Sequence, residues 1–462
     1  MKKTNFFLVF ISGIAAIGGF LFGFDMAVIS GVLPLMQQQF ELAPLQEGWL
    51  VSSALAGCII GVGASGSLGD RLGRKKLLIT AGFLFLLSTI GSALFLSFGA
   101  IIWARIIGGL GVGIASNIVP LYLSEIAPAS KRGRYVTFYQ LAVTMGILTA
   151  YLTNYGILTL AENAIGHPVL ILEYLFLTEA WRGMFLVEAL PALLFIVGLV
   201  YVPESPRWLI RKGQAVQARV ILGKITDNTE ADREATIIEQ HTNKKTGSYR
   251  DLLEPDMRRP LILGLLLPLF SQFCGINAII YYGPTILTNA GISLSNSFQS
   301  QIIFGVANMI FTFIAIWKVD QLGRRPLYLA GTAGASISLL LTGLFFFMPG
   351  IPGLWILITV SLFLASFAFS IGPLKFVVAS EIFPTHIRAR ALGLSIMVMW
   401  IADAIVGQIT AVMLREIGTS YTFLFFAFFC VVAFLTVYRL LPETKGKSLE
   451  EIEAFWKKSN TN

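Results

Sequence analysis

The chain has 462 residues, of which 55% are hydrophobic and only 13% are charged. Soluble domains carry about 25% charged residues, so this composition excludes a water-soluble protein, and we expect lipid to surround most of the chain. The 34 Lys and Arg exceed the 26 Asp and Glu and give a formal net charge of +8, which fits either a nucleic-acid partner or the topology of a membrane protein.

Cysteine and histidine offer no metal site. Cys58, Cys274 and Cys430 each lie in a long apolar run, and none belongs to a C-x-x-C motif. The three histidines fall in polar connections, outside any H-E-x-x-H or G-x-S-x-G pattern. Since zinc sites, disulfide frameworks and hydrolases need such spacings, we expect no metal, no cofactor and no enzymatic activity.

Twelve apolar runs follow one another, each long enough for a helix that spans a bilayer, which needs roughly 20 residues. The first run starts like a signal peptide, but its length, its Asp25 and the runs behind it favour a retained helix. We therefore predict an all-α membrane protein with twelve transmembrane helices. The runs cover 6–33, 49–68, 77–97, 99–122, 135–157, 182–202, 259–282, 297–317, 326–348, 354–379, 391–414 and 420–441.

The basic residues favour one side of the membrane. Arg182 and Arg415 lie on one side and Arg105 and Lys375 lie deep inside runs, which leaves 30 of the 34 Lys and Arg in the termini, in the loops after even-numbered runs or at the run ends next to them. Because Lys and Arg in short loops stay in the cytoplasm, we expect both termini to be cytoplasmic. The net basic charge then reflects topology, and no nucleic-acid partner is expected.

Three short motifs occur twice in the same order, with six runs between corresponding copies. Their register indicates parallel six-helix repeats. We predict an N-terminal bundle over 1–203, a cytoplasmic helical linker over 204–257, a C-terminal bundle over 258–442 and a cytoplasmic tail over 443–462. The motif pairs are D-R-L-G-R-K at 70–75 with D-Q-L-G-R-R at 320–325, S-E-I-A-P at 124–128 with S-E-I-F-P at 380–384, and P-E-S-P at 203–206 with P-E-T-K at 442–445.

The repeated motifs place acids and bases at the predicted cytoplasmic ends of helices. A glycine turn with basic residues is ordinary loop chemistry for one copy, but the duplication favours a shared role. Gly73 and Gly323 permit tight turns, and charged groups pair with each other and with helix dipoles. We expect such pairs to lock the halves together on this side and to open when the halves rock. The residues are Asp70, Arg74, Glu125, Arg134, Glu204, Asp320, Arg324, Glu381, Arg390 and Glu443.

Several motifs make the chain resemble the sugar porter family of the major facilitator superfamily over nearly its whole length. They are G-F-D at 23–25, R-I-I-G-G at 105–109, P-E-S-P-R-W at 203–208, G-I-N at 275–277 and P-E-T-K-G at 442–446. The loop at 70–75 is shared across the superfamily, whereas the motifs at 203 and 442 together are specific to sugar porters. The resemblance implies an alternating-access transporter with one sugar site between its halves.

Asp25, Arg105 and Glu188 are ionisable residues inside apolar runs. Counting depth from the ends of these runs places the three where they can meet, and charges in a membrane usually face a cavity and pair. One interpretation is a static buried salt bridge. The other is a site that binds and releases a proton as the halves rock. The resemblance favours the second, since proton-coupled members carry an acid matching Asp25 and facilitators tend to have a neutral residue there.

Sugars are recognised by amides, which donate and accept hydrogen bonds at once, and by aromatic faces that cover their C–H surfaces. Gln272, Asn277 and Tyr281 supply this mixture on the seventh run. A single amide more often joins two helices, but the resemblance implies sugar contacts at several matching positions. The candidate substrate residues are Phe22, Gln140, Gln272, Asn277, Tyr281, Asn308, Phe376 and Trp400, the last of which is either an aromatic wall or simple packing.

The chain departs from the family pattern at positions that bear on substrate identity. Ser271 stands where many members have the first of two glutamines, and Phe376 replaces a tryptophan. Met399 and Asp403 stand where Gln and Asn are usual. Lys375 is a further unusual charge, for which three interpretations are open: it pairs with Asp403, binds an acidic sugar, or extends its long stem to the cytoplasm. Glucose or xylose is therefore not assumed.

We expect a secondary active transporter that imports a monosaccharide or related polyol by proton symport. A passive sugar facilitator is the main alternative and depends on Asp25. A drug antiporter would lack the motifs at 203 and 442, and a nutrient sensor would need a larger signalling segment than 443–462. Short outer loops without an N-x-[ST] sequon suit a bacterial inner membrane. We expect a monomer whose partners are its substrate, a proton and lipid.

Overall fold

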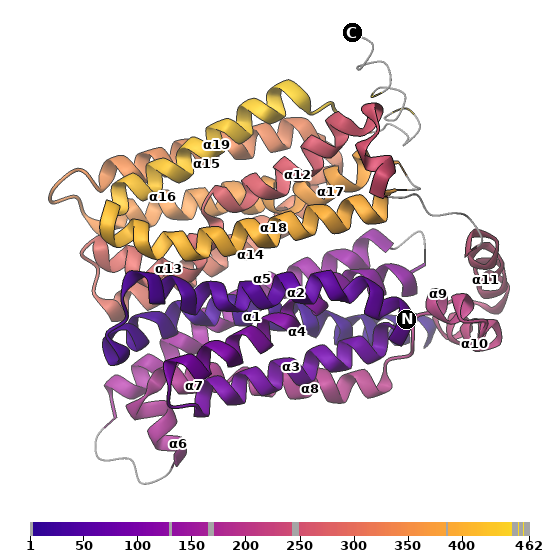
Figure 1. The fold of residues 1–462 in the computed structure, drawn as a ribbon, viewed down its shortest axis with the longest axis horizontal. Coiled ribbons are helices and arrows are strands. Elements are labelled where there is room, and N and C mark those ends of the chain that lie inside the picture. The colour runs from indigo at the N-terminus through magenta and orange to yellow at the C-terminus, as the bar shows by residue number, and fades with distance from the viewer. Residues whose placement is uncertain are drawn as a thin grey trace. The chain divides into compact units, whose positions relative to one another are not determined.

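The computed structural model describes residues 3–128, 132–164, 171–242, 249–384, 387–445, 451 and 456. Every regular element within these ranges is helical, without any strand. Twelve helical stretches are long and apolar enough to cross a membrane, and each overlaps one of the predicted runs. The predicted all-α fold with twelve transmembrane helices is confirmed (Figure 1).

The first six spans contain α1 to α8, the segment after them contains α9 to α11, and the last six spans contain α12 to α19. The bounds are α1 Lys3–Phe40, α2 Pro44–Leu72, α3 Arg74–Leu94, α4 Phe98–Ile126, α5 Arg132–Glu162, α6 Ile171–Glu173, α7 Ala180–Leu186, α8 Ala189–Tyr201, α9 Pro206–Arg211, α10 Ala215–Ile225, α11 Asn228–Thr242, α12 Arg258–Phe273, α13 Ile276–Asn289, α14 Leu294–Leu322, α15 Arg324–Phe345, α16 Gly353–Ser366, α17 Gly372–Ile382, α18 Arg388–Val412 and α19 Thr419–Leu440.

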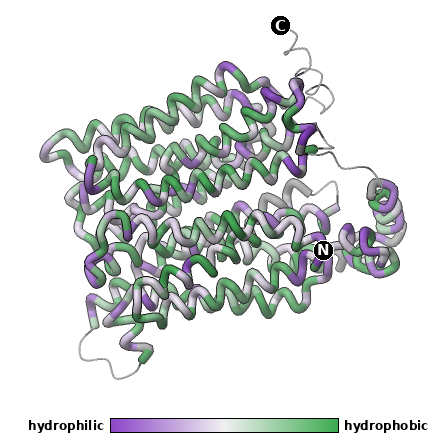
Figure 2. Tube along the Cα trace, viewed as in Figure 1, coloured by the Kyte–Doolittle hydropathy of each residue, from purple (hydrophilic) through white to green (hydrophobic). Residues whose placement is uncertain are grey.

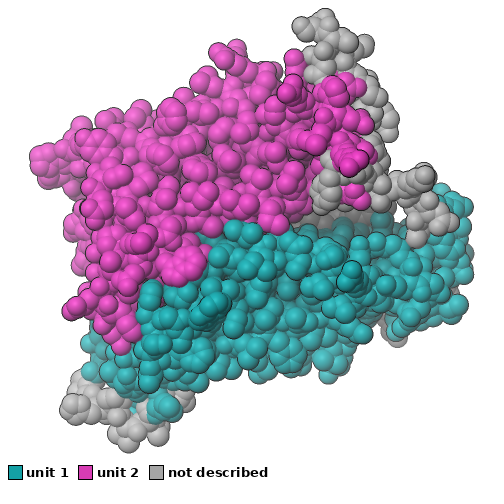
Figure 3. Space-filling model, viewed as in Figure 1, with its two compact units in different colours: residues 1–32, 53–244 teal, residues 33–52, 245–462 magenta. Residues whose placement is uncertain are grey.

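The chain packs as two units, of which unit 1 comprises residues 1–32 and 53–244 (Figure 3). In unit 1, α3 packs against α4 and α8. The α2 and α4 backbones approach so closely that a Cβ on Gly109 would lie 1.8 Å from the Ala54 carbonyl oxygen, and one on Gly57 would lie 2.2 Å from that of Ile106. Small residues permit such backbone contact between membrane helices, and here they fix the position of α4.

Within unit 1, the segment after the sixth span folds into three short helices, α9, α10 and α11, which pack against one another (Figure 1). Ser205 caps α9, since its hydroxyl accepts from the Trp208 N–H at 3.3 Å, and Pro206 occupies the first turn. Both features are typical of helix N-termini. The helical character predicted for 204–257 is thus present in the described residues.

Unit 2 comprises residues 33–52 and 245–462 (Figure 3). Here α15 packs against α16 and α19, as α3 packs against α4 and α8, which is the arrangement expected of a duplicated bundle. Residues 33–52 belong to this unit through polar contacts: Arg415 Nη2 lies 2.6 Å from Glu47 Oε1, and Ser52 Oγ donates to Gln408 Oε1 at 2.6 Å. The domain boundaries predicted from the repeats stay predictions.

Three of the spans that hydropathy predicts as continuous are interrupted. In the sixth, α7 ends at Leu186 and α8 begins at Ala189. In the seventh, α12 and α13 are separated at Gly275, whose φ of 84° is left-handed and suits glycine. In the tenth, a π-helical turn over Phe367–Ile371 joins α16 to α17, and such turns are frequent at functional sites. The interruptions place Glu188 between two helices, and they place Gln272 and Asn277 at the helix ends that flank the break in the seventh span.

Hydrophobic residues line the spans, and hydrophilic residues gather at helix ends (Figure 2). Trp103, Phe313 and Phe428 expose 68%, 61% and 62% of their surface. Extensive exposure of large apolar side chains is unfavourable in water but natural against lipid. The chain is therefore a multi-pass membrane protein.

Candidate functional site

The first candidate site lies in unit 1, where α1, α4 and the junction of α7 with α8 carry Asp25, Arg105 and Glu188, which we call the acid–base cluster. Arg105 Nη1 donates to Asp25 Oδ1 at 2.6 Å, and Thr89 Oγ1 donates to Glu188 Oε2 at 3.3 Å. Asp25, Arg105 and Glu188 are only 2%, 1% and 2% exposed, and Glu188 interacts electrostatically with the other two. The structure brings together the three residues expected to meet.

Local packing explains why helices converge on this cluster. A Cβ on Gly108 of α4 would lie 2.3 Å from Ser88 Oγ of α3, so glycine allows α3 to approach. The guanidinium carbon of Arg105 lies 5.6 Å from the centre of the Phe185 ring on α7, within the range of a cation–π interaction. The cluster is thus enclosed by α3, α4 and α7.

Charge in the acid–base cluster is unbalanced when all members are ionised, because it contains two carboxylates and one guanidinium, which pairs with Asp25 and attracts Glu188 electrostatically. Asp25 Oδ2 and Glu188 Oε1 are buried oxygens without a hydrogen-bond partner among the described residues. An uncompensated charge in a membrane is costly, and one bound proton would make the cluster neutral. The arrangement is therefore chemically able to hold one proton.

The second candidate site lies in unit 2, around the interruption of the seventh span. Gln272 lies in the last turn of α12 and Asn277 in the first turn of α13, and the left-handed Gly275 turns one towards the other. Asn277 Nδ2 donates to Gln272 Oε1 at 2.9 Å and to Asp403 Oδ2 at 2.7 Å. Tyr281 OH donates to Asp403 at 3.3 Å. We call these four residues the amide cluster, which gathers three predicted substrate residues around a carboxylate.

Lys375 also lies in the interior of unit 2. It is 8% exposed, its Nζ donates to Ser271 Oγ at 3.2 Å, and its ammonium lies 6.0 Å from the centre of the Phe367 ring. Lys375 and Asp403 interact electrostatically. The burial of Lys375 does not fit a side chain extended towards the cytoplasm, whereas the pairing of Lys375 with Asp403 stays a prediction.

The other predicted substrate residues are distributed over both units. In unit 1, the Phe22 ring stacks on Tyr139 with centroids 6.5 Å apart, and Gln140 follows Tyr139 on α5 and is half-buried. In unit 2, Asn308 on α14 accepts from Thr312 Oγ1 at 3.5 Å, and Trp400 on α18 is 1% exposed. The side chain of Phe376 lies outside the described residues.

The repeated charged motif of unit 1 forms a compact ion-pair cluster. Arg74 Nε and Nη2 donate to the two Glu125 oxygens at 3.0 Å each, and its Nη1 donates to Asp70 Oδ1 at 3.1 Å. Glu204 accepts from the Arg74 and Lys75 backbone N–H groups at 2.9 and 3.2 Å. Gly73 is required twice over: its φ is 98°, and a Cβ there would lie 2.1 Å from Glu204 Oε2.

The same cluster recurs in unit 2. Arg324 Nη2 donates to Glu381 Oε1 at 2.8 Å, and the Arg324 backbone N–H donates to Glu443 Oε1 at 3.0 Å. Burial opposes ionisation of Glu443, but backbone N–H groups that include those of Lys445, Arg324 and Arg325 outweigh it and lower the pKa of this carboxyl. Arg390 is half-buried on α18, and the side chains of Arg134 and Asp320 lie outside the described residues.

Sequence reasoning missed three hydroxyl residues that complete these clusters. Ser205 Oγ donates to Glu125 Oε2 at 2.5 Å, and at the matching place in unit 2 Thr444 Oγ1 donates to Glu381 Oε2 at 2.6 Å. Their position directly after the glutamate of each P-E-[ST] motif is the signal that would have identified them. Thr89 has no comparable motif, and only the fold places it against Glu188.

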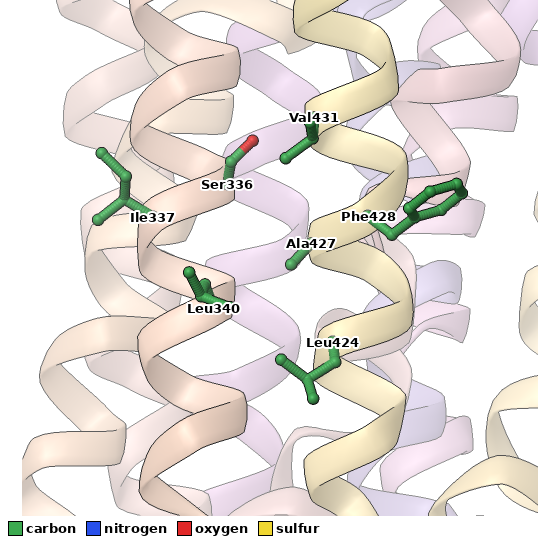
Figure 4. Close-up of a pocket in the computed structure, with 7 residues that line it drawn as sticks. All are labelled: Ser336, Ile337, Leu340, Leu424, Ala427, Phe428 and Val431. Carbon is green, nitrogen blue, oxygen red and sulfur yellow. The ribbon is translucent and has the colours of Figure 1, made fainter.

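A groove on the surface of unit 2 between α15 and α19 has a different character (Figure 4). Its lining is almost entirely apolar, with Ile337, Leu340 and Phe428 strongly exposed. Ser336 is the one polar side chain among the lining residues, so the hydroxyl groups of a sugar would have a single side-chain hydrogen-bond partner in this groove. The groove suits lipid chains, and it leaves the amide cluster as the candidate for sugar recognition.

Comparison with known proteins agrees with this chemistry. The family described as "Sugar (and other) transporter" matches residues 11–456. The chain is 39% identical to the arabinose-proton symporter of Bacillus subtilis, over 97% of this chain and 95% of that protein. It is 36% identical to the D-xylose-proton symporter of Escherichia coli, over 98% and 97%. The inward-open structure of the E. coli xylose transporter XylE matches with a TM-score of 0.83 and 35% identity, over 97% of this chain and 100% of that one.

The fold and these matches define a membrane transporter of the major facilitator superfamily, not an enzyme. Within that class, the chain belongs to the sugar porter family.

Proposed function

We propose that this transporter imports a monosaccharide or a related polyol together with a proton, by alternating access. The observation that carries the proton coupling is the acid–base cluster, in which Arg105 pairs with Asp25 and attracts Glu188 electrostatically, while each acid keeps a buried oxygen without a described partner. The amide cluster supports sugar or polyol as the substrate. The proton-symporter relatives, named for arabinose and xylose, support the same class without fixing the sugar.

The coupling follows from charge balance. With Asp25 and Glu188 ionised, the cluster carries one excess negative charge and favours an incoming proton. Once protonated the cluster is neutral, and the protein then changes conformation without an unpaired charge buried in the membrane. The repeated ion-pair clusters, with Arg74 and Arg324 at their centres, would hold the helix ends of the two bundles and release them as the bundles rock.

Transport by the purified protein in liposomes tests this proposal. A panel of D-xylose, L-arabinose, D-glucose and myo-inositol is offered with and without an imposed pH gradient. We expect accumulation of at least one substrate above its external concentration only when the gradient is present. Equilibration without accumulation would identify a passive facilitator, and no movement of any substrate would contradict sugar or polyol transport.

Substitution in the amide cluster should weaken substrate binding. Gln272→Ala and Asn277→Ala each remove one partner of a buried hydrogen bond, which costs about 1–3 kcal/mol, so the Kd should rise roughly tenfold or more. Titration of each variant in detergent measures this. Gln301→Ala, which truncates another buried glutamine of unit 2 (1% exposed), is the control and should keep the Kd. An unchanged Kd in both cluster variants would exclude this placement of the site.

We also propose that the protein lies as a monomer in a bacterial inner membrane with both termini and residues 204–257 in the cytoplasm. The support is the excess of Lys and Arg in the termini and in the loops after even-numbered spans. Reporter fusions after residue 164 and residue 230 should report opposite sides. Fusions that place 204–257 on the same side as the 158–180 loop would contradict the parallel six-helix repeats.

A further inference from the structure

Asp403 is the carboxyl group at the centre of the amide cluster. The carboxylate is 2% exposed and accepts hydrogen bonds from Asn277 Nδ2 at 2.7 Å and from Tyr281 OH at 3.3 Å. In both contacts the Asp403 carboxyl is the acceptor. An ionised carboxylate only accepts hydrogen bonds, so it decides the direction of every hydrogen bond made to it.

The hydrogen bond to Asp403 also fixes the orientation of the Asn277 amide. The amide nitrogen of Asn277 has two N–H groups, one directed to Asp403 Oδ2 at 2.7 Å and the other to Gln272 Oε1 at 2.9 Å. The amide cannot turn over, because its carbonyl oxygen would then face the carboxylate. Asn277 is the half-buried member of the cluster, and with both donors engaged it presents its carbonyl oxygen to a ligand. Gln272, whose oxygen accepts from Asn277, keeps its N–H groups for a ligand.

We propose that Asp403 is a specificity-determining residue that makes Asn277 an acceptor, so that the substrate must place a donating hydroxyl on it. The inference rests on the proposed sugar or polyol site and defines its chemistry further. A ligand group that accepts but does not donate, such as fluorine or a methoxy oxygen, is rejected at this point.

An asparagine at position 403 would behave differently. Its amide both donates and accepts, so Asn277 would be free to take either orientation and a ligand acceptor would find an N–H group. Asp403→Asn therefore removes the selection for a donating hydroxyl while keeping the shape of the side chain. Gln301→Ala is the control, since it truncates another buried glutamine of unit 2 (1% exposed) and leaves the bond between Asn277 and Asp403 in place.

The test compares two kinds of analogue of the tightest binder among D-xylose, L-arabinose, D-glucose and myo-inositol. At each position in turn the hydroxyl is replaced by hydrogen or by fluorine, and the Kd is measured on the full-length protein in detergent. In the wild type, either replacement at one position should raise the Kd roughly tenfold or more, because neither hydrogen on carbon nor fluorine donates a hydrogen bond. In Asp403→Asn the fluorinated compound at that position should bind at least threefold better than the deoxy compound, whereas Gln301→Ala should keep the wild-type pattern.

A fluorinated analogue that binds as well as its parent at every position of the wild type would overturn the inference. So would the same ratio of fluoro to deoxy Kd values in the wild type and Asp403→Asn. Failure of all four parent compounds to bind would instead contradict the proposed substrate class, and the inference would fall with it. The two kinds of failure are thus distinguishable.

A charge exchange keeps the test valid if Asp403→Asn does not fold. Asn277→Asp alone would place two carboxylates in contact, whereas the double variant Asn277→Asp with Asp403→Asn restores one acid and one amide with unchanged total charge. We expect the thermal midpoint of Asn277→Asp to fall and that of the double variant to recover at least half of the loss. No recovery would contradict the amide–carboxylate bond on which the inference depends.

Discussion

Asp25→Asn should abolish accumulation of substrate against its gradient while leaving exchange between two pools of substrate intact. Asparagine resembles the protonated carboxyl in shape and carries no charge, so the variant is held in the state that we propose crosses between conformations. A proton driving force of about 100 mV corresponds to roughly 2.3 kcal/mol for each charge moved, and the variant should lose all of it. Proton-driven uptake and counterflow, measured in the same liposomes, provide the comparison.

A static salt bridge predicts a different result for the same substitution. Loss of the contact between Arg105 Nη1 and Asp25 Oδ1, 2.6 Å in length, would leave a buried guanidinium without this partner. Folding, proton-driven uptake and counterflow would then all be impaired together. Glu188→Gln is the companion variant, because it removes the other carboxylate and leaves the Asp25–Arg105 contact. Accumulation retained in Asp25→Asn would refute coupling through Asp25.

The spans were predictable because lipid imposes a simple physical requirement. A helix must be apolar over roughly 20 residues, and hydropathy measures that property directly. The interruptions of the spans were not predictable from the sequence. Gly275 lies in an apolar run, and its left-handed φ of 84° depends on packing as well as sequence. A Cβ there would lie 2.5 Å from the Phe426 ring on α19, a contact that only the folded chain reveals.

The candidate sites were predictable to different extents. Motif duplication indicated Arg74, Glu125 and their counterparts, and the cost of charge in a membrane indicated Asp25 and Arg105. The bond between Asn277 and Asp403 joins residues 126 positions apart, and no local pattern relates them. Asp403 stood out in the sequence only as a departure from the family, and its hydrogen-bond partners required the fold.

Arg74→Ala should be among the most destabilising single substitutions in the chain, and more so than the same change at Arg324. The Arg74 side chain is 3% exposed and Glu125 is 7% exposed, whereas Arg324 and Glu381 are 14% and 22% exposed. Removing one member of a buried ion pair leaves the other charge uncompensated and costs about 3–5 kcal/mol. Water reaches the second pair and reduces the corresponding penalty.

Thermal unfolding in detergent, followed by tryptophan fluorescence, measures the difference. We expect the midpoint to fall by roughly 10 °C in Arg74→Ala and by less than half as much in Arg324→Ala. Arg211→Ala is the control, because Arg211 contacts the same cluster through Asp70 at 3.0 Å but the two side chains are 41% and 57% exposed, and such surface pairs contribute little. Equal falls in Arg74→Ala and Arg324→Ala would show that burial does not set the strength of the two clusters. A midpoint in Arg74→Ala close to that of Arg211→Ala would show that the cluster does not stabilise unit 1, and its role would then lie in the transport cycle alone.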